Sequence, residues 1–200
     1  MTDDSAAALS GNVFEYTVPA PAHVRRRRDP DRRGRIIDAA IAVIEEVGVA
    51  GTTMRLVAKK AEVPLGSLTY HFSDREELLR AAFERFDEVV VSGMIAELRA
   101  AKSAEQLLDV VARVICGPSD RRTLLLTLEL FAYASRREDM RPFVEKVLER
   151  SRREFMRFFS PCAAAALDAL LEGAYIHRTF EQTPVTFREA RILLRRLAGA

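Results

Sequence analysis

Apolar residues recur every three or four positions along most of this chain, which is the spacing of amphipathic helices. The first such stripe contains Ile36, Ile37, Ala40, Ile41 and Ile44, and it ends near two glycines at positions 48 and 51. Alternation of period two is never sustained long enough to predict a strand. We therefore predict an all-α protein of about nine helices, over residues 30–47, 53–61, 65–72, 74–99, 103–117, 121–136, 142–159, 162–180 and 186–198.

Local signals mark several of the predicted helix ends. Asp29 is a candidate N-cap before Pro30, which suits a first helical turn. Ser73 with Glu76, and Ser103 with Gln106, each match the spacing of a capping box. The signal at Ser73 predicts that a long helix, over 74–99, directly follows the two short helices predicted over 53–61 and 65–72.

The two short helices, 53–61 and 65–72, are joined by a tight break at Val63-Pro64 and have helix-turn-helix spacing. A compact three-helix core would bury Val57, Ala58, Ala61, Val63, Leu68 and Phe72. Small or hydrogen-bonding residues are left on the outer side of the second helix, which suits contact with base edges and phosphates in a major groove. The spacing alone is a weak signal, because many pairs of short helices share it.

The distribution of charge along the chain is more informative about function than the overall composition. The chain has 31 basic and 29 acidic residues and a net charge of only +2, but seven of the arginines lie between Arg25 and Arg35. Residues 1–28 show no helical or strand period and end in the run Arg25, Arg26, Arg27 and Arg28. Such a run is either a solvated tail or an arm that grips phosphates or a minor groove, and its position beside the first helix favours the arm.

Several classes of protein are excluded. No apolar run is long enough to span a bilayer, and we recognise no secretory signal. Cys116 and Cys162 are the only cysteines and belong to no CxxC or Cys/His cluster, so we expect neither a disulfide scaffold nor a zinc module. We expect a cytoplasmic protein without metal, cofactor or membrane association.

The region from about Arg33 to Phe83 contains Arg35-Ile36-Ile37-Asp38-Ala39-Ala40, Gly51-Thr52-Thr53-Met54, Val57-Ala58, and Leu68-Thr69-Tyr70-His71-Phe72 followed by Arg75-Glu76-Glu77-Leu78-Leu79. The resemblance of this region, about a quarter of the chain, is to the TetR family of transcriptional regulators. It implies an arginine-rich arm (1–28), a three-helix DNA-binding domain with the helix-turn-helix (29–76) and a larger helical ligand-binding and dimerisation domain (77–200).

The resemblance also assigns roles in DNA binding. Arg55 matches a base-reading position, and an arginine suits guanine O6 and N7. Base-facing positions match Leu65, Gly66, Ser67 and Thr69, and phosphate-holding positions match Thr53, Tyr70, His71 and Arg75. The chain departs from the family at Glu62, where glycine is usual, and at Thr69, where tyrosine is frequent. A left-handed backbone at Glu62 would cost on the order of 1 kcal/mol relative to glycine.

The later helices offer candidates for two further surfaces. Small and apolar stripes on the last two helices favour a four-helix dimer interface over packing within one core, through Leu167, Leu170, Ala174, His177, Phe187, Leu194 and Leu197. Candidates for an effector pocket are Phe86, Met94, Thr127, Glu129, Phe131, Tyr133 and Tyr175. Thr127 and Glu129 interrupt an apolar run, so either a ligand or a neighbouring arginine must satisfy them.

The preferred function is a homodimeric, sequence-specific DNA-binding regulator that reads palindromic half-sites. We expect it to be a repressor that a small, largely apolar effector releases from its operator. An architectural DNA-binding protein without a ligand is the alternative. An enzyme is disfavoured, because the sequence contains no nucleophile–base spacing, no phosphate-binding glycine loop and no paired metal ligands.

Overall fold

A computed structural model describes residues 31–117, 121–177, 180 and 185–199, and within these ranges every regular element is helical. The elements are α1 (Arg32–Gly51), α2 (Met54–Lys60), α3 (Leu65–His71), α4 (Arg75–Phe86), the π-helical turn η1 (Asp87–Val91), α5 (Ser92–Ala100), α6 (Ala104–Cys116), α7 (Arg121–Ala134), α8 (Arg141–Phe155), α9 (Pro161–His177) and α10 (Phe187–Ala198). The all-α prediction is confirmed. In the described ranges, no helix combines the length and apolar character that a bilayer crossing needs.

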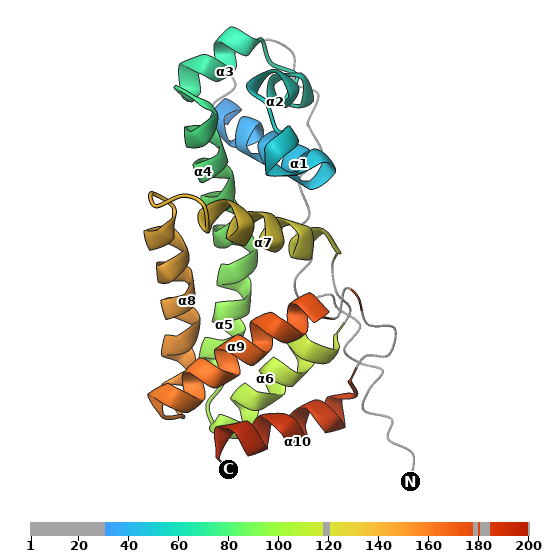
Figure 1. The fold of residues 1–200 in the computed structure, drawn as a ribbon, viewed down its shortest axis with the longest axis vertical. Coiled ribbons are helices and arrows are strands. Elements are labelled where there is room, and N and C mark those ends of the chain that lie inside the picture. Colours follow the sequence, from blue (N-terminus) through green and yellow to red (C-terminus); the bar gives the residue numbers. More distant parts are fainter. Residues whose placement is uncertain (1–30, 118–120, 178–179, 181–184, 200) are drawn as a thin grey trace.

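Helices α1, α2 and α3 form a compact unit at one end of the molecule (Figure 1). The six residues predicted for its core behave as expected, since Val57, Ala58, Ala61, Leu68 and Phe72 are buried and Val63 packs against them. The Thr53 hydroxyl caps α2 by accepting the Leu56 N–H at 3.2 Å. The tight break at Val63-Pro64 therefore holds α3 against α1 and α2 with its opposite side exposed.

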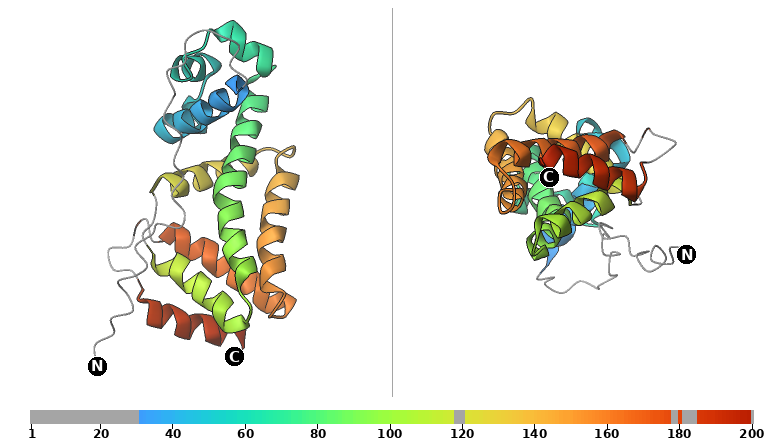
Figure 2. Two further views of the ribbon diagram at one scale, coloured as in Figure 1. Left: turned by 180° about the vertical axis from the view of Figure 1, so that it is seen from behind. Right: turned by 90° about the horizontal axis from the view of Figure 1, so that it is seen from below.

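A single long rod, made of α4, η1 and α5 without interruption, runs from this unit to the other end of the molecule (Figure 2). The predicted long helix is thus confirmed, although its middle is a π-helical turn. There the Ser92 N–H donates to the Asp87 carbonyl, five residues back. Arg150 of α8 donates to the Asp87 carboxylate at 2.6 Å and to the Ser92 hydroxyl at 2.8 Å, so one side chain spans the turn from outside.

The remaining helices pack around the rod. Helix α7 crosses it just below the N-terminal unit and α8 runs beside it, while α6, α9 and α10 lie together at the far end (Figure 1). One apolar core joins α1–α4 to α7, and a second joins α5, α6, α9 and α10. The chain is therefore arranged along one axis, with a short helix pair at one end and a three-helix layer at the other.

Several predicted helix ends shift by one to four residues. The cap of α4 is Asp74, which accepts the Glu77 N–H at 2.8 Å, rather than Ser73 paired with Glu76. Helix α8 ends at Phe155 rather than at 159, because the chain turns there before Pro161. The cap at Ser103 is confirmed. The predicted cap Asp29 and Pro30 lie outside the described residues, and in the described part α1 follows Asp31.

Glu62, in the turn between α2 and α3, has a φ of 55° and is the only non-glycine residue with positive φ among the described residues. A side chain in this region places Cβ against the following carbonyl oxygen, which glycine avoids. The condition considered for this departure from the family pattern, a left-handed residue where the family has glycine, is met.

Replacing this residue tests the cost of the turn. Glu62→Gly is expected to raise the free energy of unfolding by about 1 kcal/mol, since the strain is relieved and the exposed side chain loses no partner. Glu62→Ala is the matched control, because alanine keeps Cβ, and it should give little or no gain. Urea denaturation of the three proteins measures the difference, and equal stabilities for alanine and glycine would contradict the strain.

Candidate functional site

The outer face of α3 is open to solvent. Leu68 and Phe72 point into the core, whereas Leu65, Thr69 and Tyr70 are exposed, and Tyr70 is 85% accessible. A Cβ added at Gly66 would meet no atom within 4 Å, so its backbone presents an unobstructed surface. The structure thus gathers the residues matched to base contacts on one free helix face.

The other residues matched to DNA contacts surround this face. Arg55 is exposed on α2, and Thr53 is exposed at the start of the same helix. His71 is half-buried with its ring at the edge of Tyr70, the centroids 5.2 Å apart. Ser67 is half-buried and accepts a hydrogen bond from Arg32 at 3.3 Å, which leaves its O–H and a second lone pair for another partner.

Arg75 does not belong to this surface, contrary to the phosphate contact assigned to it. Its Nε donates to the Thr52 carbonyl at 2.7 Å and its Nη2 donates to the Val49 carbonyl. Its Nη1 lies 3.0 Å from Glu76. Because three of its donors are engaged inside the protein, Arg75 ties the start of α4 to the end of α1 and is a structural residue.

The arginine run Arg25 to Arg28 lies outside the described residues. The first described basic residues after it, Arg32 and Arg33, both contact α3 or its end. Arg32 reaches Ser67, and the Arg33 guanidinium lies 5.0 Å from the centre of the Phe72 ring. The start of α1 is thus adjacent to the exposed face of α3, which is compatible with an arm that continues toward the same DNA.

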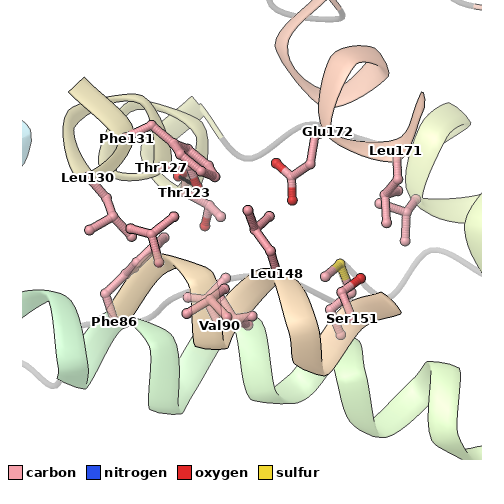
Figure 3. A pocket seen from close by; sticks show the side chains of 15 residues that line it. Phe86, Val90, Thr123, Thr127, Leu130, Phe131, Leu148, Ser151, Leu171 and Glu172 are labelled. Carbon is pink, nitrogen blue, oxygen red and sulfur yellow. Dashed lines mark hydrogen bonds between the residues drawn. The ribbon is translucent and has the colours of Figure 1, made fainter. Parts of the chain in front are cut away.

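A cavity lies in the middle of the molecule between the rod, α7, α8 and α9 (Figure 3). Its volume is about 80 Å³, and 15 of the described residues line it. Eleven of them are apolar, and the polar ones are Thr123, Thr127, Ser151 and Glu172. A mostly apolar lining with a few polar groups is typical of a site for a small organic molecule.

Four of the seven residues predicted for an effector pocket line this cavity: Phe86, Met94, Thr127 and Phe131. Tyr133 does not, because its ring packs 5.8 Å from that of Phe83 in the N-terminal core. Glu129 faces the end of α1, where its carboxylate accepts the Val49 N–H at 2.9 Å. Neither of the two partners foreseen for Glu129, a ligand or an arginine, is correct. The side chain of Tyr175 lies outside the described part of the chain.

Glu172 is the residue that sequence reasoning missed. Among the described residues that line the cavity it is the only charged one, and Figure 3 shows its carboxylate pointing into the empty space from α9. Burial raises the pKa of this carboxyl to about 7, with a smaller contribution from the negative charge of Asp168 one turn earlier. An acidic residue within the alanine- and leucine-rich sequence of α9 was the available signal.

The charged groups around the cavity are otherwise paired. Asp168 is buried and accepts a hydrogen bond from Arg152 at 2.9 Å. Asp87 is buried and accepts from Arg150. The Ser151 hydroxyl, which lines the cavity beside these arginines, is buried and has no hydrogen-bond partner. Ser151 and Glu172 are therefore the two cavity groups whose polar atoms await a partner.

The predicted dimer residues divide into three sets. Leu167 and Leu194 are fully buried in the core of their own chain, so their assignment to an interface is wrong. Their stripes face α6, because α6 supplies the apolar surface that α9 and α10 must cover. Leu170, Ala174 and His177 instead line a shallow groove between α9 and α10, together with Leu193. Phe187 and Leu197 are exposed on α10.

The raised pKa of Glu172 predicts a pH-dependent stability. In the unfolded chain the carboxyl ionises near pH 4.5, whereas in the folded chain it stays protonated to about pH 7. Unfolding therefore releases a proton in this window, and the free energy of unfolding falls as the pH rises through it. Glu172→Gln removes this loss and should stabilise the protein by roughly 2–3 kcal/mol at about pH 8 and hardly at about pH 5.

Urea denaturation at the two pH values measures the effect. Glu149→Gln, at an exposed position of α8, is the matched control and should leave stability unchanged at both. A gain for Glu172→Gln that is equal at both pH values would contradict a buried ionisation.

The chain is similar in sequence to known proteins over both of its parts. Residues 36–82 match the model of the bacterial regulatory proteins of the tetR family, and residues 98–200 match the tetracyclin repressor-like C-terminal domain. The HTH-type transcriptional regulator BetI of Proteus mirabilis (strain HI4320) is 28% identical over 173 residues, which cover 80% of this chain and 86% of BetI.

Solved structures agree in fold. A protein of Streptomyces coelicolor A3(2) described as a transcriptional regulator superposes with a TM-score of 0.78 at 35% identity, over 86% of this chain and 100% of its own. The multidrug binding protein EbrR, complexed with imidazole, gives a TM-score of 0.71 at 37% identity over 91% of this chain and 97% of its own. EbrR has also been solved with malachite green and with ethidium. This chain, with its helix-turn-helix at one end and its cavity beyond it, belongs to the TetR family of transcriptional regulators.

Proposed function

We propose that this protein is a homodimeric transcriptional repressor whose α3 reads operator DNA and whose central cavity takes the small molecule that releases it. One observation carries the proposal: the rod that begins beside α3 also forms a wall of the cavity. Phe86 and Val90 of that rod line the cavity, one to two dozen residues after the helix-turn-helix ends. An occupant of the cavity therefore presses on the element that positions α3.

The DNA contact is assigned to the exposed face of α3 with Arg55 beside it. Leu65, Gly66 and Thr69 offer apolar contacts and a close backbone approach, and Arg55 offers a fork of donors to a guanine. Tyr70 and His71, at the end of α3, are assigned to phosphates together with Thr53. The arginine arm adds contacts without sequence preference.

A second copy of the chain is assigned to the groove between α9 and α10. One reading helix covers few base pairs, so a useful operator requires two half-sites and a two-fold dimer. Exposed apolar side chains on α10 favour this face: Val185 precedes the helix, and Phe187, Ile192, Leu193 and Leu197 lie on it. Apolar groups in this density on one helix are typical of a covered surface.

The effector is assigned to the cavity on the strength of its apolar lining. EbrR, which shares this fold, has been solved with imidazole, malachite green and ethidium, and this similarity supports an aromatic effector for the present chain. Release then follows if the effector prefers a dimer shape in which the two α3 helices no longer match successive major grooves. We further propose that the protein works in the cytoplasm and catalyses no reaction.

Base and phosphate contacts are separable by substitution. Arg55→Ala is expected to cost about 1–3 kcal/mol on the operator and much less on random duplex, because an arginine that reads guanine acts only on its own sequence. Tyr70→Phe should reduce the affinity for the operator and for random duplex by the same factor, since a phosphate contact carries no sequence information. Fluorescence anisotropy on both duplexes measures these losses.

Arg153→Ala is the control for charge alone, since this exposed arginine lies on α8, far from α3. It should change neither affinity. If Arg55→Ala reduced the two affinities by the same factor, Arg55 would hold a phosphate and would not read a base.

Two neighbouring leucines separate the dimer interface from the core. Leu193 is 48% exposed in the groove, so Leu193→Glu is expected to give folded monomers that no longer bind the operator tightly. Leu194 is fully buried, so Leu194→Glu should unfold the C-terminal core. Sedimentation velocity with circular dichroism distinguishes the outcomes, and a dimeric, helical Leu193→Glu protein would place the interface elsewhere.

A further inference from the structure

The cavity carries a negative charge that the apolar lining does not explain. Helix α9 contributes Leu171 and Glu172 to the wall, and the Glu172 carboxylate extends into the open space opposite Thr127 and Phe131 of α7 (Figure 3). Leu148 of α8 lies between them.

No described residue neutralises this carboxylate. It makes no hydrogen bond and no ion pair within the described ranges. The two arginines of α8 that flank the cavity-lining Ser151 in the sequence are already engaged, Arg152 with Asp168 and Arg150 with Asp87. On α7, Arg122 pairs with Glu45 of α1, and Glu129 bonds to Val49, so both face away from the cavity.

Nor does the protonated form have a partner among the described residues. The hydroxyl of Thr127, which lines the same cavity, donates to the Thr123 carbonyl at 2.8 Å and makes no hydrogen bond with Glu172. The buried hydroxyl of Ser151 also has no partner. Glu172 is half-buried and Ser151 is fully buried, and neither has a partner among the described residues, so both groups gain from a ligand that supplies one.

We propose that Glu172 is the counter-ion of the effector, so that the cavity selects a flat, apolar molecule carrying one positive charge. The inference deepens the proposed function and rests on it. Such a cation would place its charge beside Glu172 and its rings among Phe86, Phe131 and Met94, with the unpartnered Ser151 hydroxyl free to accept a hydrogen bond. The faces of the two phenylalanine rings add attraction for a cation.

The assignment has two consequences for selectivity. An anion is excluded, since it would meet Glu172 and, behind it, Asp168. A neutral aromatic molecule still gains from the apolar wall but leaves Glu172 without a partner, so it binds more weakly than a cation of the same shape. Because the pKa of Glu172 is about 7 before binding, the affinity for a permanent cation should also rise about tenfold from about pH 6 to about pH 8.

A matched pair of fluorescent probes tests the inference: acridine and 10-methylacridinium. They share one ring system, and at about pH 8 only the second is charged, permanently. Binding to the full chain is followed by fluorescence titration for the wild type, Glu172→Gln and Glu149→Gln. Glutamine keeps the shape and removes the charge, and Glu149→Gln removes an exposed charge from α8.

We expect the wild type and Glu149→Gln to bind 10-methylacridinium at least about tenfold more tightly than acridine, and Glu172→Gln to lose this preference while binding acridine as before. The pH dependence of cation binding should vanish in Glu172→Gln. Equal affinity for both probes in the wild type, or an unchanged preference and pH dependence in Glu172→Gln, would overturn the inference.

The wild-type pH titration uses no variant, so the inference can fail even if a substitution disturbs folding. Release of operator DNA by each probe is measured in parallel. If acridine releases the DNA as well as the cation does, the proposed function stands and the inference about charge fails. If neither probe binds the cavity, the proposed function fails with it.

Discussion

The structure depends on an apolar core that the DNA-binding unit and the cavity share. Phe86, Val90 and Leu130 are buried in the core that contains α1, α2 and α3, and the same three side chains line the cavity. A close-packed core transmits a displacement because its side chains cannot be compressed independently. The three-helix unit is thus not an independent domain joined by a linker. Its orientation is fixed by the helices that surround the cavity.

Polar contacts reinforce this connection at one point, the end of α1. The chain bends at Gly48, which has a φ of 71°. Glu129 of α7 accepts the N–H of Val49 from one side, and Arg75 of α4 donates to the carbonyls of Val49 and Thr52 from the other. The segment between α1 and α2 is therefore held by one helix from the cavity wall and by the first residue of the rod. A shift of α7 against α4 must strain this bend, and α2 and α3 follow directly after it.

Sequence reasoning was accurate where the chemistry is local. Helical period, caps and the break at Val63-Pro64 sufficed to predict the helix-turn-helix and its core. The predictions failed where an apolar stripe on a helix could pack either against its own chain or against a second copy. Leu167 and Leu194 have the same spacing as an interface stripe, and only the position of α6 decides that they are internal. Arg75 and Glu129 failed for a related reason, since their partners are backbone groups, which no side-chain pattern reveals.

The π-helical turn lies at the part of the rod that lines the cavity. Phe86, Val90 and Met94 follow one another at intervals of four residues, so they share one face of the rod, and Val91 of the turn lines the cavity beside them. The same turn buries Asp87, and a buried carboxylate is tolerable only with a close partner, which Arg150 of α8 provides. Arg150 also binds Ser92, so the turn is clamped to the helix that supplies Val147, Leu148 and Ser151 to the opposite wall. A movement of α8 that widens the cavity therefore displaces the turn through Arg150. The turn is part of the rod that follows α3, so the displacement reaches the helix-turn-helix.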